Sequence, residues 1–121
     1  TVYTLLQIPS GSGALFPGTR AISAPITIAS GRTPLILGKL SAYLIDKLKA
    51  MTSDPKRALF VGDNLKTDIL TGRQCSFRTV FVLTGTHSLD DAKRFAQSEN
   101  AEEQMCVPDF YINAFSDLAL K

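Results

Sequence analysis

The feature that most constrains this sequence is a series of short apolar runs that alternate with polar segments in its C-terminal half. The runs at 58–61, 79–83 and 110–112 are typical of strands, whereas 67–74 and 90–98 show helical patterns. The first run is continuously apolar, as in a parallel strand that is buried on both faces. Alternating strands and helices predict an α/β fold, in which flanking helices cover a parallel sheet.

The N-terminal half gives a more mixed pattern. Residues 2–8 are rich in β-forming side chains and lead into a Pro/Gly/Ser turn, so we expect a strand there. The stretch 18–30 fits either a helix or a strand, because Pro25 would cost a helix interior about 3 kcal/mol. We expect a short strand at 35–37 and a helix at 44–51, where apolar residues recur at helical spacing.

Composition excludes several classes of function. The 121 residues suffice for one compact domain, and the net charge of +2 is spread without a Lys/Arg block, so no nucleic-acid partner is expected. The apolar runs are too short to span a bilayer and no signal peptide is visible, so we expect a cytoplasmic protein that binds no membrane.

Cys75 and Cys106 lie far apart without a CxxC motif, which predicts two reduced, partly buried thiols. The first residue is Thr1 rather than Met, which suggests a processed product or an excised piece.

The clearest candidate for chemistry is the turn that follows the run at 58–61. Gly62 and Asp63 come directly after it, at the strand end where open α/β sheets bind ligands, and Asp68 lies in the first turn of the next helix. Magnesium prefers oxygen ligands and needs only one or two carboxylates beside water and a substrate phosphate. The pattern therefore predicts a magnesium site at Asp63. The alternative is that the two carboxylates only cap the turn.

A second candidate is Lys39, which follows Gly38 between the run at 35–37 and the next helix. A lysine at such a junction can offset the charge of a phosphoryl group. Taken alone, it is more often a solvated surface residue.

Other motifs fail on inspection. The glycines at 13 and 18 have P-loop spacing, but Thr19 and Arg20 replace the Lys-Ser/Thr pair of that motif. A dinucleotide-binding fingerprint fails because its third glycine is misplaced. His87 has no nucleophile nearby in the sequence, so we expect a histidine in a surface loop.

Four segments, taken together, resemble a known family. They are Ser30-Gly31-Arg32-Thr33-Pro34, Gly38-Lys39, the block from Val61 to Leu70, and Val82-Leu83-Thr84-Gly85. Their order and spacing are similar to those of the haloacid-dehalogenase-like (HAD) phosphatases with a large α/β cap. That branch holds nucleotide phosphatases, para-nitrophenylphosphatases, phosphoglycolate phosphatases and pyridoxal phosphatases. The resemblance runs from about Phe16 to the C-terminus.

The resemblance implies roles for the candidate residues. Lys39 would face the phosphate, with Gly38 beside it, and Asp63 would be a direct ligand of Mg²⁺. The residues expected to support this ligand are Asp68, Asn64 and Thr67. Residues 1–37 would be the C-terminal remnant of the cap domain, and residues 38–121 the second half of a Rossmann-like HAD core.

The sequence also departs from the family pattern. In this family one Asp attacks phosphorus and a second Asp two positions later acts as acid and base, but no two Asp residues here are separated by a single residue. The Ser/Thr-bearing phosphate loop of the first half of the core is missing as well. Leu40 stands where relatives usually have Pro, and Arg20 and Pro25 replace small residues of the cap.

Two hypotheses follow. In the first, the chain is part of a magnesium-dependent phosphatase that acts on a small phosphorylated metabolite through an aspartyl-phosphate, and a missing N-terminal half supplies the nucleophile. The isolated chain would then be inactive. In the second, the chain is a truncated, non-catalytic relative that acts through protein–protein interaction. Without the partner strands of the missing half, the strand at 58–61 would expose an unpaired apolar edge, which favours self-association and predicts a homo-oligomer.

Overall fold

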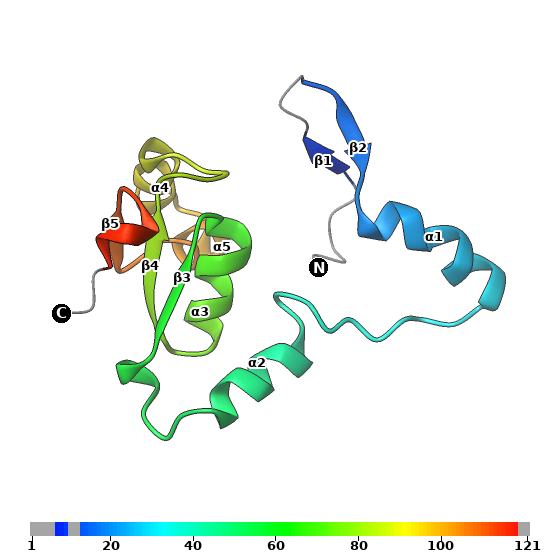
Figure 1. Ribbon diagram of the computed structural model, residues 1–121, viewed down its shortest axis with the longest axis horizontal. Coiled ribbons are helices and arrows are strands. Elements are labelled where there is room, and N and C mark those ends of the chain that lie inside the picture. The colour runs from blue at the N-terminus through cyan, green and yellow to red at the C-terminus, as the bar shows by residue number, and fades with distance from the viewer. Residues whose placement is uncertain (1–6, 10–12, 119–121) are drawn as a thin grey trace. The chain divides into compact units, whose positions relative to one another are not determined.

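The computed structural model describes residues 7–9 and 13–118, and it divides into two units, Thr1–Leu44 and Ile45–Lys121 (Figure 1). In the first unit, β1 (Gln7–Pro9) pairs antiparallel with β2 (Leu15–Pro17), and Ile8 lies opposite Phe16. The expected strand at 2–8 falls largely outside the described residues. The division of the chain into a cap remnant and a core half stays a prediction.

Helix α1 (Thr19–Ser30) resolves the ambiguity of the stretch 18–30 in favour of a helix. The helix contains Pro25 and ends at Gly31, whose positive φ of 62° is readily adopted by glycine. The strand expected at 35–37 is wrong. These residues form extended chain without an assigned strand, and Leu35 and Leu37 are exposed. An apolar run alone does not make a strand without a partner to pair with.

Helix α2 (Ala42–Ala50) confirms the expected helix at 44–51. After it, the carboxylate of Asp54 accepts a hydrogen bond from the Lys56 N–H at 3.1 Å and caps a short 3₁₀ turn, η1 (Pro55–Arg57). Proline suits such a first helical position because its missing N–H needs no partner there.

The second unit contains the expected parallel sheet, with β3 (Leu59–Gly62), β4 (Arg78–Val82) and β5 (Phe110–Ile112) in the order β3-β4-β5. Figure 1 shows the three strands side by side. In register, Phe60 lies opposite Thr79, and Phe81 opposite Tyr111. The α/β fold class is thereby confirmed.

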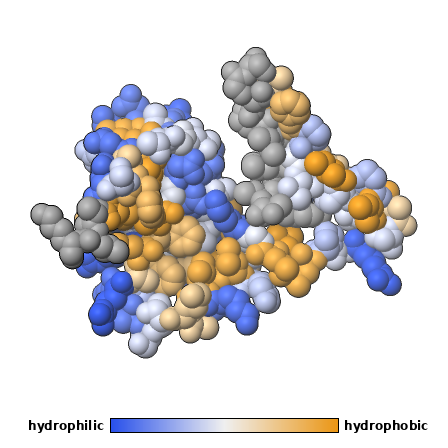
Figure 2. Space-filling model, in the orientation of Figure 1, coloured by the Kyte–Doolittle hydropathy of each residue, from blue (hydrophilic) through white to orange (hydrophobic). Residues whose placement is uncertain are grey.

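Burial within this sheet bears on two expectations. The run at 58–61 was expected to be buried on both faces in a whole core, and to present an unpaired apolar edge without the strands of the missing half. Within the described chain β3 is an edge strand and Leu59 is 53% exposed. The central strand β4 is the buried one, with Val80, Phe81 and Val82 in the core. Apolar side chains consequently remain on the surface over the sheet, as Figure 2 shows.

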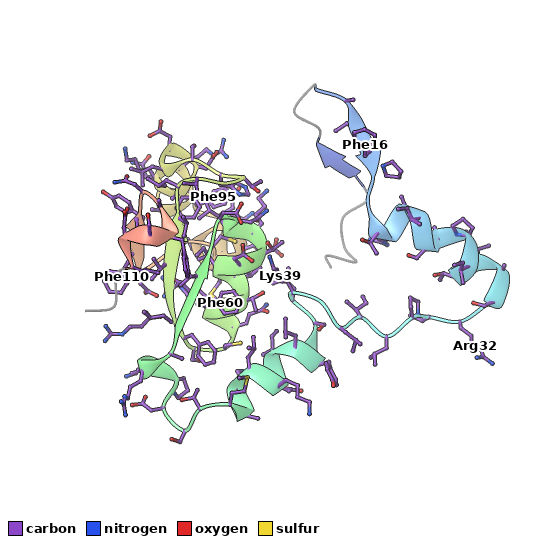
Figure 3. All side chains as sticks on the ribbon, viewed as in Figure 1. Phe16, Arg32, Lys39, Phe60, Phe95 and Phe110 are labelled. Carbon is purple, nitrogen blue, oxygen red and sulfur yellow. The ribbon has the colours of Figure 1, made fainter. Side chains whose placement is uncertain are left out.

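The core of the second unit lies between the sheet and the segments that follow β3 and β4. These segments are η2 (Leu65–Ile69), α3 (Leu70–Gln74), α4 (Leu89–Ala96) and α5 (Ala101–Gln104), the last of which the sequence pattern did not reveal. The core cluster consists of Leu65, Ile69, Phe81, Ala92, Phe95 and Cys106. Phe95, labelled in Figure 3, is only 1% exposed.

A polar link joins the start of β4 to the start of β5. The carboxylate of Asp109 accepts hydrogen bonds from the N–H of Thr79 at 2.7 Å and from its hydroxyl at 2.9 Å. Arg73, on α3, forms an ion pair with the same carboxylate at 3.2 Å and donates to the Val107 carbonyl. Because Thr79 is completely buried, this link satisfies polar groups that water cannot reach.

Both cysteines are free, as expected, and both are buried more fully than expected. Burial raises the pKa of the Cys75 thiol and of the Cys106 thiol above the ordinary value, since a thiolate would lose its hydration. In the described part of the chain, none of the helices has the length and apolar character needed to cross a membrane.

Candidate metal and phosphate site

The turn from Gly62 to Asp68 is built by a helix cap. The Asn64 side-chain oxygen accepts hydrogen bonds from the N–H groups of Lys66 at 3.0 Å and Thr67 at 3.1 Å. The first helical turn, η2, has π-type geometry and starts at Leu65, two residues before the helix start expected at 67. Such π segments are rare and are frequent at functional sites.

Asp68 closes this turn from the helix side. The residue is 3% exposed. Its carboxylate accepts a hydrogen bond from the Asn64 N–H at 3.2 Å, while the Asp68 N–H donates to the Asn64 carbonyl at 2.8 Å. The Asp68 side chain also occupies the space where a Cβ on Gly62 would lie. A side chain at position 62 would therefore push this carboxylate away, which explains why glycine precedes Asp63.

Asp63 itself lies at the carboxyl end of β3 and is half-buried. Its Oδ2 accepts two hydrogen bonds from Thr86, from the N–H at 2.9 Å and from the hydroxyl at 3.1 Å. Its carbonyl accepts from the His87 N–H at 3.3 Å. A Cβ on Gly85 would collide with the Asp63 carboxylate. The loop that follows β4 is thus folded around Asp63, because Gly85 lies against its carboxylate and Thr86 donates two hydrogen bonds to it.

Sequence reasoning missed Gly85 and Thr86 as partners of Asp63. A usable signal was present, because Thr84-Gly85-Thr86 follows the strand at 79–83 just as Gly62-Asp63 follows the strand at 58–61. The carboxyl ends of neighbouring parallel strands meet at the same edge of a sheet. The assignment of the strands could therefore have placed the two loops beside each other.

His87 differs from the expected surface loop histidine. It is only partly exposed, and its Nδ1 atom is buried without a hydrogen-bond partner among the described residues. Its ring packs at 6.4 Å from the ring of Phe95, which holds it against the core. The loop then runs into α4 through a capping box, in which Ser88 donates to the Asp91 carboxylate from its N–H and its hydroxyl. These bonds lower the pKa of Asp91.

Lys39 and Gly38 lie in the first unit, in a turn that a hydrogen bond from the Ser41 N–H to the Gly38 carbonyl closes at 3.1 Å. Lys39 is half-buried, and Leu40 has a φ of 69°. Proline cannot adopt this conformation, because its ring fixes φ near −65°. Leucine in place of the usual proline therefore permits a different turn after Lys39. The approach of Lys39 to Asp63 stays a prediction, since each unit is described by itself.

The residues around Asp63 fit a magnesium ion by their chemistry. The turn offers carboxylate, amide and hydroxyl oxygens, which are the hard ligands that Mg²⁺ prefers. The glycines at 62 and 85 leave the space that the carboxylates of Asp68 and Asp63 occupy. Within residues 7–9 and 13–118, no group of three or more His, Cys, Asp or Glu side chains could hold a metal by itself. This arrangement suits an ion that takes its remaining ligands from water, a substrate phosphate or another segment.

Comparison with known proteins identifies the class. A family model described as HAD-hydrolase-like matches residues 36–118, so the chain belongs to the HAD-like hydrolases, as the resemblance had implied. Mouse chronophin is 39% identical over 111 residues, which cover 91% of this chain and 37% of that protein.

Two solved structures extend the comparison. The 4-nitrophenylphosphatase of Thermotoga maritima is 31% identical, with a TM-score of 0.62, over 91% of this chain and 39% of its own. A glycerol phosphate phosphatase of Mycobacterium tuberculosis, solved in complex with magnesium, is 28% identical, with a TM-score of 0.60, over 89% of this chain and 30% of its own. The chain thus spans between 30% and 39% of the length of these relatives.

Proposed function

We propose that this chain is the magnesium-side half of a phosphatase that hydrolyses a small phosphorylated metabolite. The observation that carries the proposal is the placement of Asp63 at the carboxyl end of β3, held by the loop after β4, in a chain of the HAD-like family. The similarity to a phosphatase solved with magnesium supports Mg²⁺ as the cofactor. The proposed cellular compartment is the cytoplasm.

The proposed reaction divides hydrolysis into two displacements. An Asp of the N-terminal half attacks phosphorus, the P–O bond to the leaving alcohol breaks, and an aspartyl-phosphate forms. A second Asp of that half protonates the leaving oxygen and then takes a proton from water, which releases inorganic phosphate.

In this scheme the chain supplies charge and position. Bound Mg²⁺ would neutralise charge on the phosphoryl oxygens. Asp63 would hold the ion, and Lys39, with Gly38 leaving space at the turn, would place a positive charge on the phosphate. Asp68, Asn64 and Thr67 would keep Asp63 in place, because their hydrogen bonds build the turn that carries it.

A second candidate function is favoured by the exposed apolar edges of the sheet. Leu59 on β3 is 53% exposed, and Phe110 and Tyr111 on β5 are 51% and 57% exposed. Edge strands with apolar side chains are templates for pairing with another chain. A non-catalytic relative could act through either edge of the sheet, and a homo-oligomer is expected for the isolated chain. Sedimentation that shows a stable monomer would contradict the expected oligomer.

Catalysis distinguishes the two functions. The isolated chain should release no phosphate from para-nitrophenyl phosphate with Mg²⁺, whereas a polypeptide extended by an N-terminal half with the Asp-x-Asp motif should release it. If the extended polypeptide is folded and inactive, the interaction function is favoured instead. Turnover by the isolated chain that depends on Asp63 would show that the nucleophile does not come from a missing half.

The role of Asp63 is tested in that extended polypeptide. Asp63→Asn should lower kcat/KM by at least about 100-fold, because a neutral amide is a poor magnesium ligand and metal-site changes are costly. Asp90→Asn removes a carboxylate whose side chain is 91% exposed on α4 and should leave the rate unchanged. Equal rates for the Asp63→Asn variant and the wild type would remove Asp63 from the site.

A further inference from the structure

The Asp63 carboxylate is held by a residue to which the family resemblance assigned no role. Thr86 donates to the same oxygen, Oδ2, from its backbone N–H at 2.9 Å and from its hydroxyl at 3.1 Å. The backbone donor would be present with any residue except proline at position 86. The hydroxyl is the part that depends on the side chain, and a single substitution can remove it.

Other contacts around Asp63 restrict the direction in which its carboxylate can point. Gly85 lies against the carboxylate, so that a Cβ there would collide with it, and the His87 N–H fixes the Asp63 carbonyl at 3.3 Å. The loop is anchored in turn by the capping box of α4 at Ser88. Two donors converging on one carboxylate oxygen limit rotation about the bond to the Asp63 Cβ, since rotation would break both hydrogen bonds.

We infer that Thr86 is a positioning residue for magnesium, whose hydroxyl sets the orientation in which Asp63 meets the ion. The inference rests on the proposed function, since it needs Mg²⁺ at Asp63. Metal-ligating carboxylates are commonly oriented by outer hydrogen bonds, and the loss of such a partner typically lowers metal affinity by 10–100-fold. Because Thr86 is exposed and its N–H remains in the variants, we expect the lower end of this range.

The competing explanation is that Thr86 only closes the loop. In that case removal of the hydroxyl would lower the thermal stability of the chain and leave metal affinity unchanged. Thr86→Val is nearly isosteric and removes only the hydrogen bond, whereas Thr86→Ser restores a hydroxyl in the same place. Thr84→Val removes a hydroxyl from the same loop and serves as the matched control.

The experiment titrates the full 121-residue chain with Mn²⁺, a paramagnetic substitute for Mg²⁺, and follows NMR line broadening at the amides of residues 64 and 86. The wild type, Thr86→Ser and Thr84→Val should give affinities within about twofold of one another. Thr86→Val should bind about 10-fold more weakly. Thr86→Ala, measured in parallel, should match Thr86→Val, and the thermal midpoints without metal should stay close to that of the wild type.

Different results would overturn different statements. If Thr86→Val binds Mn²⁺ as tightly as the wild type while Asp63→Asn does not, the positioning role is wrong and the metal site stands. If Asp63→Asn binds as the wild type does, or if the wild type shows no broadening at these amides, the proposed function fails together with the inference. Weaker binding by Thr84→Val as well would show a loop effect and would also overturn the positioning role.

Discussion

The two units of this chain differ in how far their apolar side chains are buried. In the second unit, Phe81 and Phe95 are 0% and 1% exposed and share a core with residues from two connections of the sheet. In the first unit, Phe16 on β2 is 58% exposed, and Ile26 and Ile28 on α1 are 72% and 80% exposed. α1 has no buried residue along its whole length. Similar apolar content thus gives a core in one unit and an exposed surface in the other.

The difference shows which part of the chain carries its own stability. A β-α-β series brings three parallel strands together and buries one face of the sheet under the connections. The second unit therefore forms a core from its own apolar side chains. A two-stranded hairpin with one helix has no comparable partner surface. We therefore expect the truncation of apolar side chains to be costly in the second unit and nearly silent in the first.

The largest effect should come from a matched pair of phenylalanines. Phe95→Ala should lower the free energy of unfolding by about 3–5 kcal/mol, because it leaves a cavity in a closed core. Phe16→Ala, at an exposed position, should change it by about 0.5 kcal/mol or less. Urea unfolding followed by circular dichroism measures both. Equal losses would mean that the first unit has a core of comparable quality.

A smaller effect is expected from the link between β4 and β5. Asp109→Ala should cost about 3 kcal/mol, because it leaves the buried Thr79 N–H and hydroxyl without their charged acceptor. Asp90→Ala on α4, where the carboxylate is exposed, is the control and should cost almost nothing. If Asp90→Ala lowered the stability by a similar amount, the loss would come from the removal of a charge in general and not from the link between β4 and β5.

The next effect concerns packing of α3 on the sheet. A Cβ at Gly72 would lie 2.6 Å from the Thr79 Cγ2 and 2.8 Å from the Phe60 Cβ. Gly72→Ala should therefore destabilise the second unit by about 2 kcal/mol through overpacking, despite the better helix propensity of alanine. A neutral or stabilising result in thermal unfolding would show that α3 can shift away from the sheet.

The smallest effect is a pH dependence at the start of α4. The pKa of Asp91 is lowered chiefly by hydrogen bonds from the Ser88 N–H and hydroxyl. Because the folded pKa lies below the unfolded one, the stabilisation is present above the ordinary carboxyl pKa and is lost as the pH falls through the lowered value. Ser88→Ala should thus lower the thermal midpoint at pH 7 by more than it does near pH 2. If Ser88→Ala lowered the thermal midpoint equally at both pH values, the linkage would be contradicted.

The sequence predicted the parts of the fold that depend on short-range pattern. β4, β5 and α2 lie within one or two residues of their expected bounds, and the turn at Asp63 follows a strand as expected. The apolar run alone could not distinguish an edge strand from a central one, so the exposed edge at Leu59 could be expected only from the missing half that the family resemblance implies. The pattern also left the stretch 18–30 undecided between helix and strand because of Pro25, whereas α1 is helical there although none of its residues is buried.

The candidate site was predictable to a similar extent. Asp63 and Asp68 could be selected because both lie within one contiguous turn. Thr86 and Gly85 lie more than 20 positions from Asp63, so a local pattern could not select them, and only the assignment of two neighbouring parallel strands could have placed them beside it. The orientation of His87 toward Phe95 likewise depends on how α4 packs.

Anomalous diffraction from crystals of the chain soaked in Mn²⁺ would test the central claim most directly. The account predicts a strong anomalous peak about 2.0–2.2 Å from a carboxylate oxygen of Asp63, in keeping with a hard divalent cation bound by oxygen. A well-ordered Asp63 without such a peak, in crystals whose ions occupy other positions, would contradict the claim.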